Sequence, residues 1–226
     1  MKTESELEKP TERRPLASRQ WRFTNVLAGW LARKGVQPNA ISLVGLAAGV
    51  LGGLTLWLTS WDVAAPVFWL LSAGLVQLRL LCNLIDGMVA VESGKRSVLG
   101  ELYNEVPDRV SDAATLIGLG YAAGSVPWLG DLAAILAVLV AYIRAEIKVA
   151  GGPQDYCGPM AKPHRMFVVT MTALICALVP MPIQRSIIGH DWALPAAALA
   201  VIAAGCVVTA IRRLVRGARA LEGKTP

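Results

Sequence analysis

Charged residues are scarce in this sequence. They make up 17% of its 226 residues, whereas hydrophobic residues make up 54%, and the mean hydropathy is +0.50. In a typical soluble domain about a quarter of the residues are charged. This scarcity, together with several apolar runs of the roughly 20 residues that a membrane-spanning helix needs, argues against an ordinary soluble protein. We therefore interpret the chain as an all-α, polytopic membrane protein.

Other missing features narrow the possible functions further. The four cysteines form no CxxC pair, so they do not indicate a redox compartment. The basic residues, which give a net charge of +6, flank apolar segments and do not form the basic soluble face that nucleic-acid binding requires. The first sixteen residues are too polar for a signal peptide, so we expect residues 1–16 to form a disordered cytoplasmic tail.

Six apolar runs predict six transmembrane helices, because a long apolar segment satisfies its backbone in lipid by forming a helix. We place these helices at about 40–60, 64–90, 103–122, 130–150, 164–182 and 193–212. They belong to a single membrane domain, 17–215, which is followed by a short cytoplasmic tail, 216–226.

The distribution of lysine and arginine predicts the orientation of these spans. Nearly all of them lie near the termini or in the loops of one side, whereas the opposite loops contain only Arg185. The positive-inside rule then places both termini in the cytoplasm. Trp61, Trp128 and Trp192 lie where the outer membrane–water interface is expected, as in an aromatic belt. We expect an integral protein of a bacterial inner membrane.

The segment "SRQWRFTNVLAGWLARKG", which precedes the first span, predicts an amphipathic helix. Phe23, Val26, Leu27, Trp30 and Leu31 recur at helical spacing among basic residues. This pattern fits a helix that lies in the cytoplasmic interface of the membrane. A plain linker is the alternative interpretation.

A polar stretch, "NLIDGMVAVESGKRSVLGELYNEVPD" at residues 83–108, interrupts the apolar pattern. Asn83 and Asp86 are three residues apart, and Asn104 and Asp108 are four apart, so each pair lies on one helix face. Because the loop between them is short, we expect the two helices to be antiparallel neighbours with the pairs facing each other. Side-chain oxygens suit Mg²⁺ or Mn²⁺, and such a site suits phosphoryl chemistry. Hydration or helix packing through hydrogen bonds is the alternative.

The same stretch resembles the two-part signature of the CDP-alcohol phosphatidyltransferase family, D-x-x-D-G-x-x-A-R and then G-x-x-x-D-x-x-x-D. Asp86 and Asp108 stand at the second and fourth acids, and Gly87, Ala90 and Gly100 match the small residues. The stretch "GVQPNAIS" also resembles the segment that precedes the family's first membrane helix. The resemblance covers roughly residues 20–212.

This resemblance implies an enzyme of phospholipid biosynthesis that transfers a phosphatidyl group from CDP-diacylglycerol to a polar hydroxyl acceptor and releases CMP. It implies two divalent ions held by four acids, with Asp108 as the catalytic base. The small residues Gly87, Ala90 and Gly100 would border the CDP-lipid. It also implies a homodimer embedded among membrane lipids.

The chain departs from the signature at Asn83, Val91 and Asn104. The two amides still offer oxygen ligands but remove two of the four formal negative charges, and Val91 removes an arginine that would contact phosphate. The chain is then an enzyme that works with compensating residues or with a single metal ion. Alternatively, it is an inactive family member that binds lipid or acts as a scaffold.

Two kinds of neighbouring residue are candidates for compensation. Asp112 lies one turn beyond Asp108 and continues the same helix face, so we include it among the expected metal ligands, Asn83, Asp86, Asn104 and Asp108. Lys95 or Arg96, in the connecting loop, would replace the missing arginine next to the CDP-lipid.

Basic residues elsewhere in the spans are candidates for binding the acceptor or its phosphate. They are Arg79, Arg144, Lys148 and Arg165. Arg79 is the most unusual, because an arginine inside a membrane span is costly and usually faces a partner or a cavity. A structural salt bridge, for example to Glu146, is the alternative for Arg79, and positive-inside anchoring is the alternative for the others.

Overall fold

The computed structural model describes residues 22–61, 64–94, 98–188 and 192–223. Every regular element within these ranges is a helix, which confirms the all-α class. The expected tail at 1–16 lies outside the described residues. The elements are α1 (Arg22–Arg33), α2 (Pro38–Leu58), the 3-10 helix η3 (Thr59–Trp61), α3 (Ala65–Glu92), α4 (Val98–Gly120), α5 (Pro127–Val149), α6 (Lys162–Leu178), α7 (Met181–Ile188) and α8 (Leu194–Glu222).

Three helical segments of the described chain are long and apolar enough to cross a membrane: Pro38–Trp61, Ala65–Glu92 and Leu194–Glu222. Helices α4, α5 and α6 occupy the other three predicted spans. Of these, α6 has 17 residues, and the first half of α4 is rich in charged residues. Helix α8 runs to Glu222, so it continues past residue 215, where we expected the membrane domain to end.

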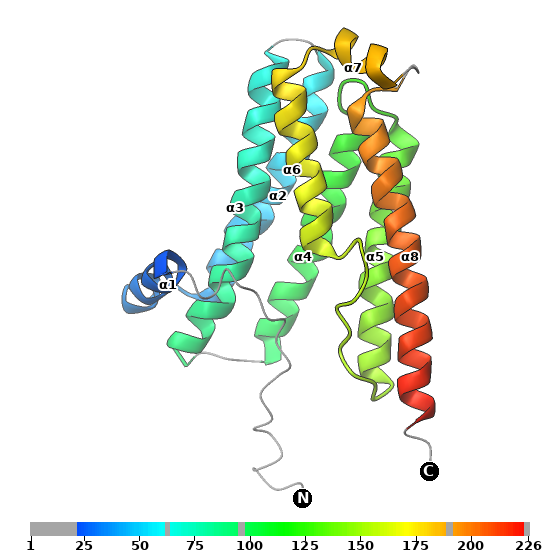
Figure 1. Cartoon of the computed structure of the whole chain (residues 1–226). Coiled ribbons are helices and arrows are strands. Elements are labelled where there is room, and N and C mark those ends of the chain that lie inside the picture. The colour runs from blue at the N-terminus through cyan, green and yellow to red at the C-terminus, as the bar shows by residue number, and fades with distance from the viewer. Residues whose placement is uncertain (1–21, 62–63, 95–97, 189–191, 224–226) are drawn as a thin grey trace, which may run out of the picture.

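The long helices form a bundle, with α1 beside one end of it and α7 at the other end (Figure 1). Helix α2 packs against α3 and α4, α5 packs against α4 and α8, and α6 packs against α3 and α8. Helices α3 and α4 are not among the described helix pairs that pack closely, although the short connection between them predicted close neighbours. Polar side chains, described below, connect these two helices instead.

A face of glycines on α2 explains why α4 packs so closely against it. Glycines occur at 45, 49 and 53, one on each turn. A Cβ atom added at Gly53 would lie 2.2 Å from the carbonyl oxygen of Ala114, and one added at Gly118 would lie 2.1 Å from the carbonyl oxygen of Gly53. Small residues at such spacing are typical of close helix packing in membranes, and the backbones of α2 and α4 are in direct contact here.

The remaining interior is apolar and made largely of small and branched side chains. The largest fully buried side chains of the main cluster include Leu56, Trp69, Leu116, Leu199 and Ile202. They come from α2, α3, α4 and α8. This packed core fixes the relative positions of the helices whose ends carry the polar signature.

Candidate active site

The two predicted polar pairs lie on α3 and α4, and side-chain hydrogen bonds join them. Asn83 Nδ2 donates to Asn104 Oδ1 and to Asp108 Oδ1, with both distances 2.8 Å. The structure therefore brings these three side chains together across the space between the two helices. The spacing argument anticipated this, but it did not anticipate that an amide of one pair donates to the carboxylate of the other.

Asp86 lies apart from that group and faces α2. Its side chain is buried, with 3% of the residue exposed. Ser42 Oγ donates to Asp86 Oδ2 at 2.7 Å, whereas Asp86 Oδ1 is buried and makes no hydrogen bond to any described residue. Ser42 was not predicted as a site residue. The sequence feature that could have pointed to Ser42 is its position in the stretch "GVQPNAIS", one turn after Pro38.

Arg79 connects α3 to α4 through two contacts. Its guanidinium pairs with Asp108 Oδ1, and its Nε donates to Ser111 Oγ at 2.8 Å. Arg79 is 3% exposed. The salt bridge that we considered for this residue therefore exists, but Asp108 is its partner rather than Glu146.

The glycine face of α2 makes room for the Arg79 side chain. A Cβ atom added at Gly45 would lie 3.1 Å from Arg79 Nη1, and one added at Gly49 would lie 3.4 Å from Arg79 Cδ. Larger residues at these positions would meet the arginine as it passes over α2. The same repeat of glycines therefore permits both the close helix packing and the path of a buried cation.

Lys162 and Arg165 bring positive charge to the site from the first turn of α6. Lys162 Nζ lies 2.7 Å from Asp108 Oδ1 and 3.7 Å from Asp112 Oδ1. Arg165 Nη2 lies 3.0 Å from Asp112 Oδ2, and Arg165 Nη1 donates to the carbonyl oxygen of Met160 at 2.8 Å. Asp112, which we expected to compensate at a metal site, thus faces two cations.

One oxygen of Asp108 receives most of these contacts. Asn83, Arg79 and Lys162 all meet Oδ1, whereas the described cation that pairs with Oδ2 is Arg109, at 3.9 Å. The Asp108 side chain is therefore held in a fixed orientation, with one oxygen much less engaged than the other.

The predicted basic residues of α5 lie in a neighbouring group. Arg144 Nη2 donates to Glu105 Oε1 at 2.8 Å and to Oε2 at 2.9 Å, and the Arg144 guanidinium lies 5.1 Å from the centre of the Tyr156 ring. Arg109 pairs with the same Glu105 at 2.6 Å. Lys148 is in the last turn of α5. These contacts join α5 to α4 beside the site.

The small residues of the signature lie on two helices: Gly87 and Ala90 follow Asp86 on α3, and Gly100 is near the start of α4. A Cβ atom added at Gly87 would meet nothing within 4 Å, so space is open there. Ala90 is one turn beyond Asp86 on the same helix. Gly100 lies in the first turn of α4. Lys95 lies outside the described residues.

The described residues include no group of three or more His, Cys, Asp or Glu side chains arranged to hold a metal ion. Asp86 and Asp108 come from different helices, and Asp112 is engaged by Lys162 and Arg165. The donor set for a cation therefore consists of carboxylate oxygens with amide oxygens beside them. Such a set suits a hard divalent ion, but with less negative charge than four acids would supply.

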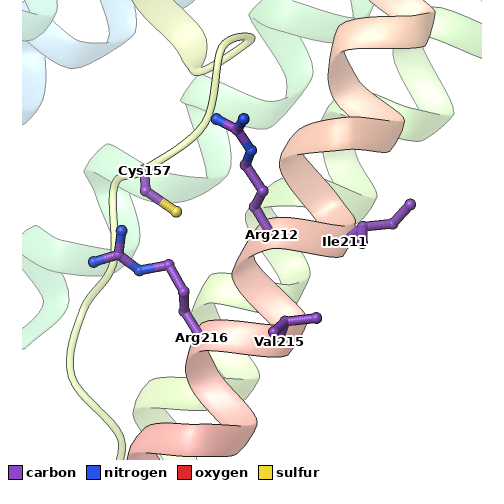
Figure 2. Close-up of a pocket in the computed structure, with 5 residues that line it drawn as sticks. All are labelled: Cys157, Ile211, Arg212, Val215 and Arg216. Atoms are coloured by element: carbon purple, nitrogen blue, oxygen red, sulfur yellow. The ribbon is translucent and has the colours of Figure 1, made fainter.

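A separate pocket lies between α8 and the segment that precedes α6 (Figure 2). In that view the guanidinium groups of Arg212 and Arg216 point toward the segment that carries Cys157. Arg216 Nε lies 2.8 Å from Asp155 Oδ2. Burial acts to raise the pKa of Asp155, but hydrogen bonds with Cys157 and the charge of Arg216 hold that pKa below its ordinary value. The pocket is lined by Cys157, Ile211, Arg212, Val215 and Arg216, none of which belongs to the signature.

Comparison with curated proteins identifies relatives of this chain. An inner membrane protein of Escherichia coli K12, YnbA, is 30% identical over 155 residues, which cover 69% of this chain and 75% of the relative. Phosphatidylinositol phosphate synthase of Streptomyces avermitilis is 29% identical over 207 residues, which cover 85% of this chain and 78% of that protein. The synthase of Mycobacteroides abscessus is 27% identical over 190 residues, covering 80% and 81%. No protein-family model matches this chain.

Solved structures share the fold described above. The crystal structure of Mycobacterium tuberculosis phosphatidylinositol phosphate synthase (PgsA1) with CDP-DAG bound matches with a TM-score of 0.70 and 24% identity, covering 87% of this chain and 94% of that one. The structure of the same protein in complex with manganese and citrate matches with a TM-score of 0.68 and 24% identity, covering 86% and 88%.

The sequence similarity, the shared helical fold and the signature residues on α3 and α4 agree with one another. The resemblance inferred from "NLIDGMVAV" and "GELYNEVPD" is thereby confirmed, despite the amides at Asn83 and Asn104. This chain belongs to the CDP-alcohol phosphatidyltransferase family.

Proposed function

We propose that this chain is a membrane transferase that moves the phosphatidyl group of CDP-diacylglycerol to the hydroxyl group of a polar acceptor and releases CMP. The observation that carries the proposal is the meeting of Asn83, Asn104 and Asp108 at the ends of α3 and α4. These are signature positions of the family. The relative PgsA1, which has the same fold, has been crystallised with CDP-DAG bound.

Asp108 is the proposed catalytic base in this reaction. Its Oδ1 accepts a hydrogen bond from Asn83 and pairs with Arg79 and Lys162, which leaves Oδ2 as the oxygen that can accept the proton of the attacking hydroxyl. Phosphoryl transfer depends mainly on positioning and on electrostatic stabilisation. A well-oriented carboxylate therefore suits the role.

The donor set fits a divalent ion, Mg²⁺ or Mn²⁺. Asp86 Oδ1 is buried and makes no hydrogen bond to a described residue, which suits an oxygen that takes a metal ligand. Asn83, Asn104 and Asp108 offer the remaining side-chain oxygens, and Asp112 contributes only if it leaves its contacts with Lys162 and Arg165. When bound, such an ion would neutralise negative charge on the substrate phosphates.

The small residues beside Asp86 are the proposed border of the CDP-lipid site. Gly87 has open space around it, and Ala90 and Gly100 present little side-chain volume. A nucleotide can then approach the helix backbone closely. Lys95, in the connecting loop, is the residue proposed to replace the arginine that Val91 lacks.

The acceptor is proposed to bind on the side of α5 and α6. Arg144, Lys148 and Arg165 lie there, and Arg79 reaches the same region from α3. Arg144 and Arg165 already pair with Glu105 and Asp112 respectively. An acceptor that carries a phosphate would share these cations with the carboxylates, so we expect phosphate-bearing alcohols to be the first to test.

We further propose that six helices span the membrane and that the site faces the cytoplasm. Exposed Phe23, Val26 and Trp30 on α1 (64, 67 and 50% exposed) fit a helix lying in the interface. Exposed tryptophans occur near the opposite ends of the long helices, at Trp61 and Trp128. We also propose a homodimer, as the family resemblance implies.

The test is CMP release. Purified full-length protein is incubated with CDP-diacylglycerol, Mg²⁺ or Mn²⁺, and a panel of alcohols that includes inositol phosphate and glycerol phosphate. We expect CMP release that depends on the acceptor. If no acceptor in the panel supports release from well-folded protein, the proposed activity is wrong, and the chain is better explained as an inactive member that binds lipid.

A further inference from the structure

Asp108 is surrounded by positive charge that the protein itself supplies. The Arg79 guanidinium pairs with Asp108 Oδ1, and Lys162 Nζ lies 2.7 Å from the same oxygen. Arg79 is 3% exposed and is held on its other side by Ser111, and the Lys162 side chain is 15% exposed. A buried cation needs an opposite charge beside it to be stable, and Asp108 supplies that charge to both residues. Both are therefore built into the site.

Asn83 is consistent with a site that contains no additional cation next to Asp108. Its Nδ2 donates directly to Asp108 Oδ1 at 2.8 Å. An aspartate at position 83, which the family signature calls for, would place a like charge against Asp108 and would need an intervening cation to be stable. The amide converts that repulsion into a hydrogen bond, so the contact between α3 and α4 forms without a metal ion.

The buried charges around Asp108 also balance without a bound ion. Asp108 and Asp112 pair with Arg79, Lys162 and Arg165, and the buried Asp86 brings the carboxylates to the same number as these cations. Uncompensated charge is costly away from water, so two divalent ions would leave a large positive excess. The diphosphate of a CDP-lipid carries two negative charges, which a single divalent ion balances.

Among the described side chains, Asp86 offers a position for that ion, on the side of the site that faces α2. Asp86 is 3% exposed, its Oδ2 accepts a hydrogen bond from Ser42, and its Oδ1 makes none to a described residue. Neither Arg79 nor Lys162 forms a salt bridge with Asp86 in the described structure. Asp86 therefore remains available to a ligand, whereas Asp108 is already compensated.

We propose that Arg79 and Lys162 replace one of the two divalent ions that the family signature implies, so that this chain binds a single Mg²⁺ or Mn²⁺ at Asp86. The inference rests on the proposed function, because the CDP-lipid supplies the charge that the one ion balances. Arg79 and Lys162 act on the reaction through Asp108, whose carboxylate they position.

The test counts bound ions. Full-length protein in lipid nanodiscs that contain CDP-diacylglycerol is titrated with Mn²⁺, and free Mn²⁺ is measured by electron paramagnetic resonance. Nanodiscs without protein give the background from lipid. We expect one Mn²⁺ per chain, and also one for the control Arg216→Met, whose side chain is 65% exposed and pairs only with Asp155 in the described structure. Two ions per wild-type chain, or none, would overturn the proposal.

Variants test which residues set the count. The triple variant Asn83→Asp, Asn104→Asp and Arg79→Met restores the acids and removes one cation, so we expect two Mn²⁺ per chain. A folded triple variant that still binds one ion contradicts the role given to Arg79. In Lys162→Met, the loss of a nearby positive charge should tighten Mn²⁺ binding about fivefold or more. Unchanged affinity contradicts the role of Lys162, whether or not the triple variant folds.

CMP release from the same samples separates this inference from the proposed function. A chain that binds one ion but releases no CMP with any acceptor contradicts the proposed activity and supports the single-ion site. A chain that releases CMP while it binds two ions supports the activity and contradicts the single-ion site. Thermal unfolding and size-exclusion profiles establish that each variant is folded.

Discussion

At the scale of single residues, the chemistry of this chain depends on how Asp108 is surrounded. Its Oδ1 meets Asn83, Arg79 and Lys162, and its Oδ2 lies 3.9 Å from Arg109. These contacts hold the carboxylate in one orientation. In the proposed single-ion site, cations from α3 and α6 pair with Asp108 in place of one divalent ion.

Replacement of Asp108 by asparagine removes the proposed base while keeping the shape of the side chain. We expect CMP release by Asp108→Asn to fall by about 10²–10⁴-fold, measured with CDP-diacylglycerol and the best acceptor. Asp131→Asn, an exposed aspartate on α5, is the matched control and should keep wild-type activity. A folded Asp108→Asn protein with activity close to wild type would show that another group takes the proton.

The buried pair of Asp112 and Arg165 makes a prediction about stability. Both residues are 2% exposed, and their charged atoms are 3.0 Å apart. Asp112→Asn leaves buried cations without their carboxylate, so we expect a loss of about 3–5 kcal/mol in the free energy of unfolding. The measurement is thermal unfolding in detergent, compared with wild type.

A matched control comes from an ion pair at the surface. Arg216 and Asp155 form a pair in which the arginine is 65% exposed, and Asp155→Asn should cost no more than about 1 kcal/mol. The double variant Asp112→Leu with Arg165→Met should recover part of the lost stability, because it removes both charges together. Equal effects at the buried and the exposed pair would contradict this account.

At the scale of helices, the glycine face of α2 decides how α4 is placed. Helix α4 contacts α2 along that face, whereas α3 and α4 are connected mainly by polar side chains. The site therefore lies between two helices that do not pack directly against each other. Their separation leaves space for long side chains such as Arg79 to cross from one helix to the other.

Gly53→Ala tests the close contact of α2 with α4. The added Cβ would lie 2.2 Å from the carbonyl oxygen of Ala114, so the helices must move apart, and we expect a destabilisation of about 1–3 kcal/mol. Gly74→Ala on α3 is the matched control, because an added Cβ there meets nothing within 4 Å. We expect that control to be neutral or slightly more stable, since alanine favours helix. Midpoints of thermal unfolding in detergent compare the two, and equal midpoints would refute the close contact.

At the scale of the whole molecule, the arrangement of apolar and basic residues predicts how the chain lies in the membrane. Helix α1 and the C-terminal end of α8 lie at the same end of the bundle in Figure 1, and α7 lies at the opposite end. The basic residues of the last turns of α1, α5 and α8 are Arg33, Lys148 and Arg219. At the opposite end, the last turn of α7 carries Arg185. The greater number of basic residues at the site end is the reason for proposing that this end faces the cytoplasm.

Reporter fusions test this orientation. Alkaline phosphatase joined after residue 61 should be active, because that enzyme folds only outside the cytoplasm, and the same reporter joined after residue 226 should be inactive. A fluorescent protein joined after residue 226 should fluoresce. An active phosphatase at the C-terminus would reverse the orientation and place the site on the other side of the membrane.

The sequence by itself determined the class of fold, the family and the two helix faces that carry the signature. Hydrophobic runs can be recognised in the sequence without knowledge of tertiary contacts. The helix faces on which Asp86 and Asp108 lie follow from the fixed spacing of residues on a helix. The sequence predicted six membrane spans, whereas three helical segments of the described chain have the length and composition of a span. Helix α4 has charged residues in its first half, and α6 has 17 residues.

Only the tertiary structure decided which charges meet. Lys162 and Asp108 are separated by more than fifty positions in the sequence, yet their charged atoms are 2.7 Å apart, and Arg79 reaches Asp108 rather than Glu146 because the glycine face of α2 leaves a path for it. Charge pairing depends on distances of a few ångströms between elements that are distant in sequence. Spacing along one helix cannot supply those distances, so the sequence alone indicated the missing acids, and the fold indicated the cations that pair with the acids that are present.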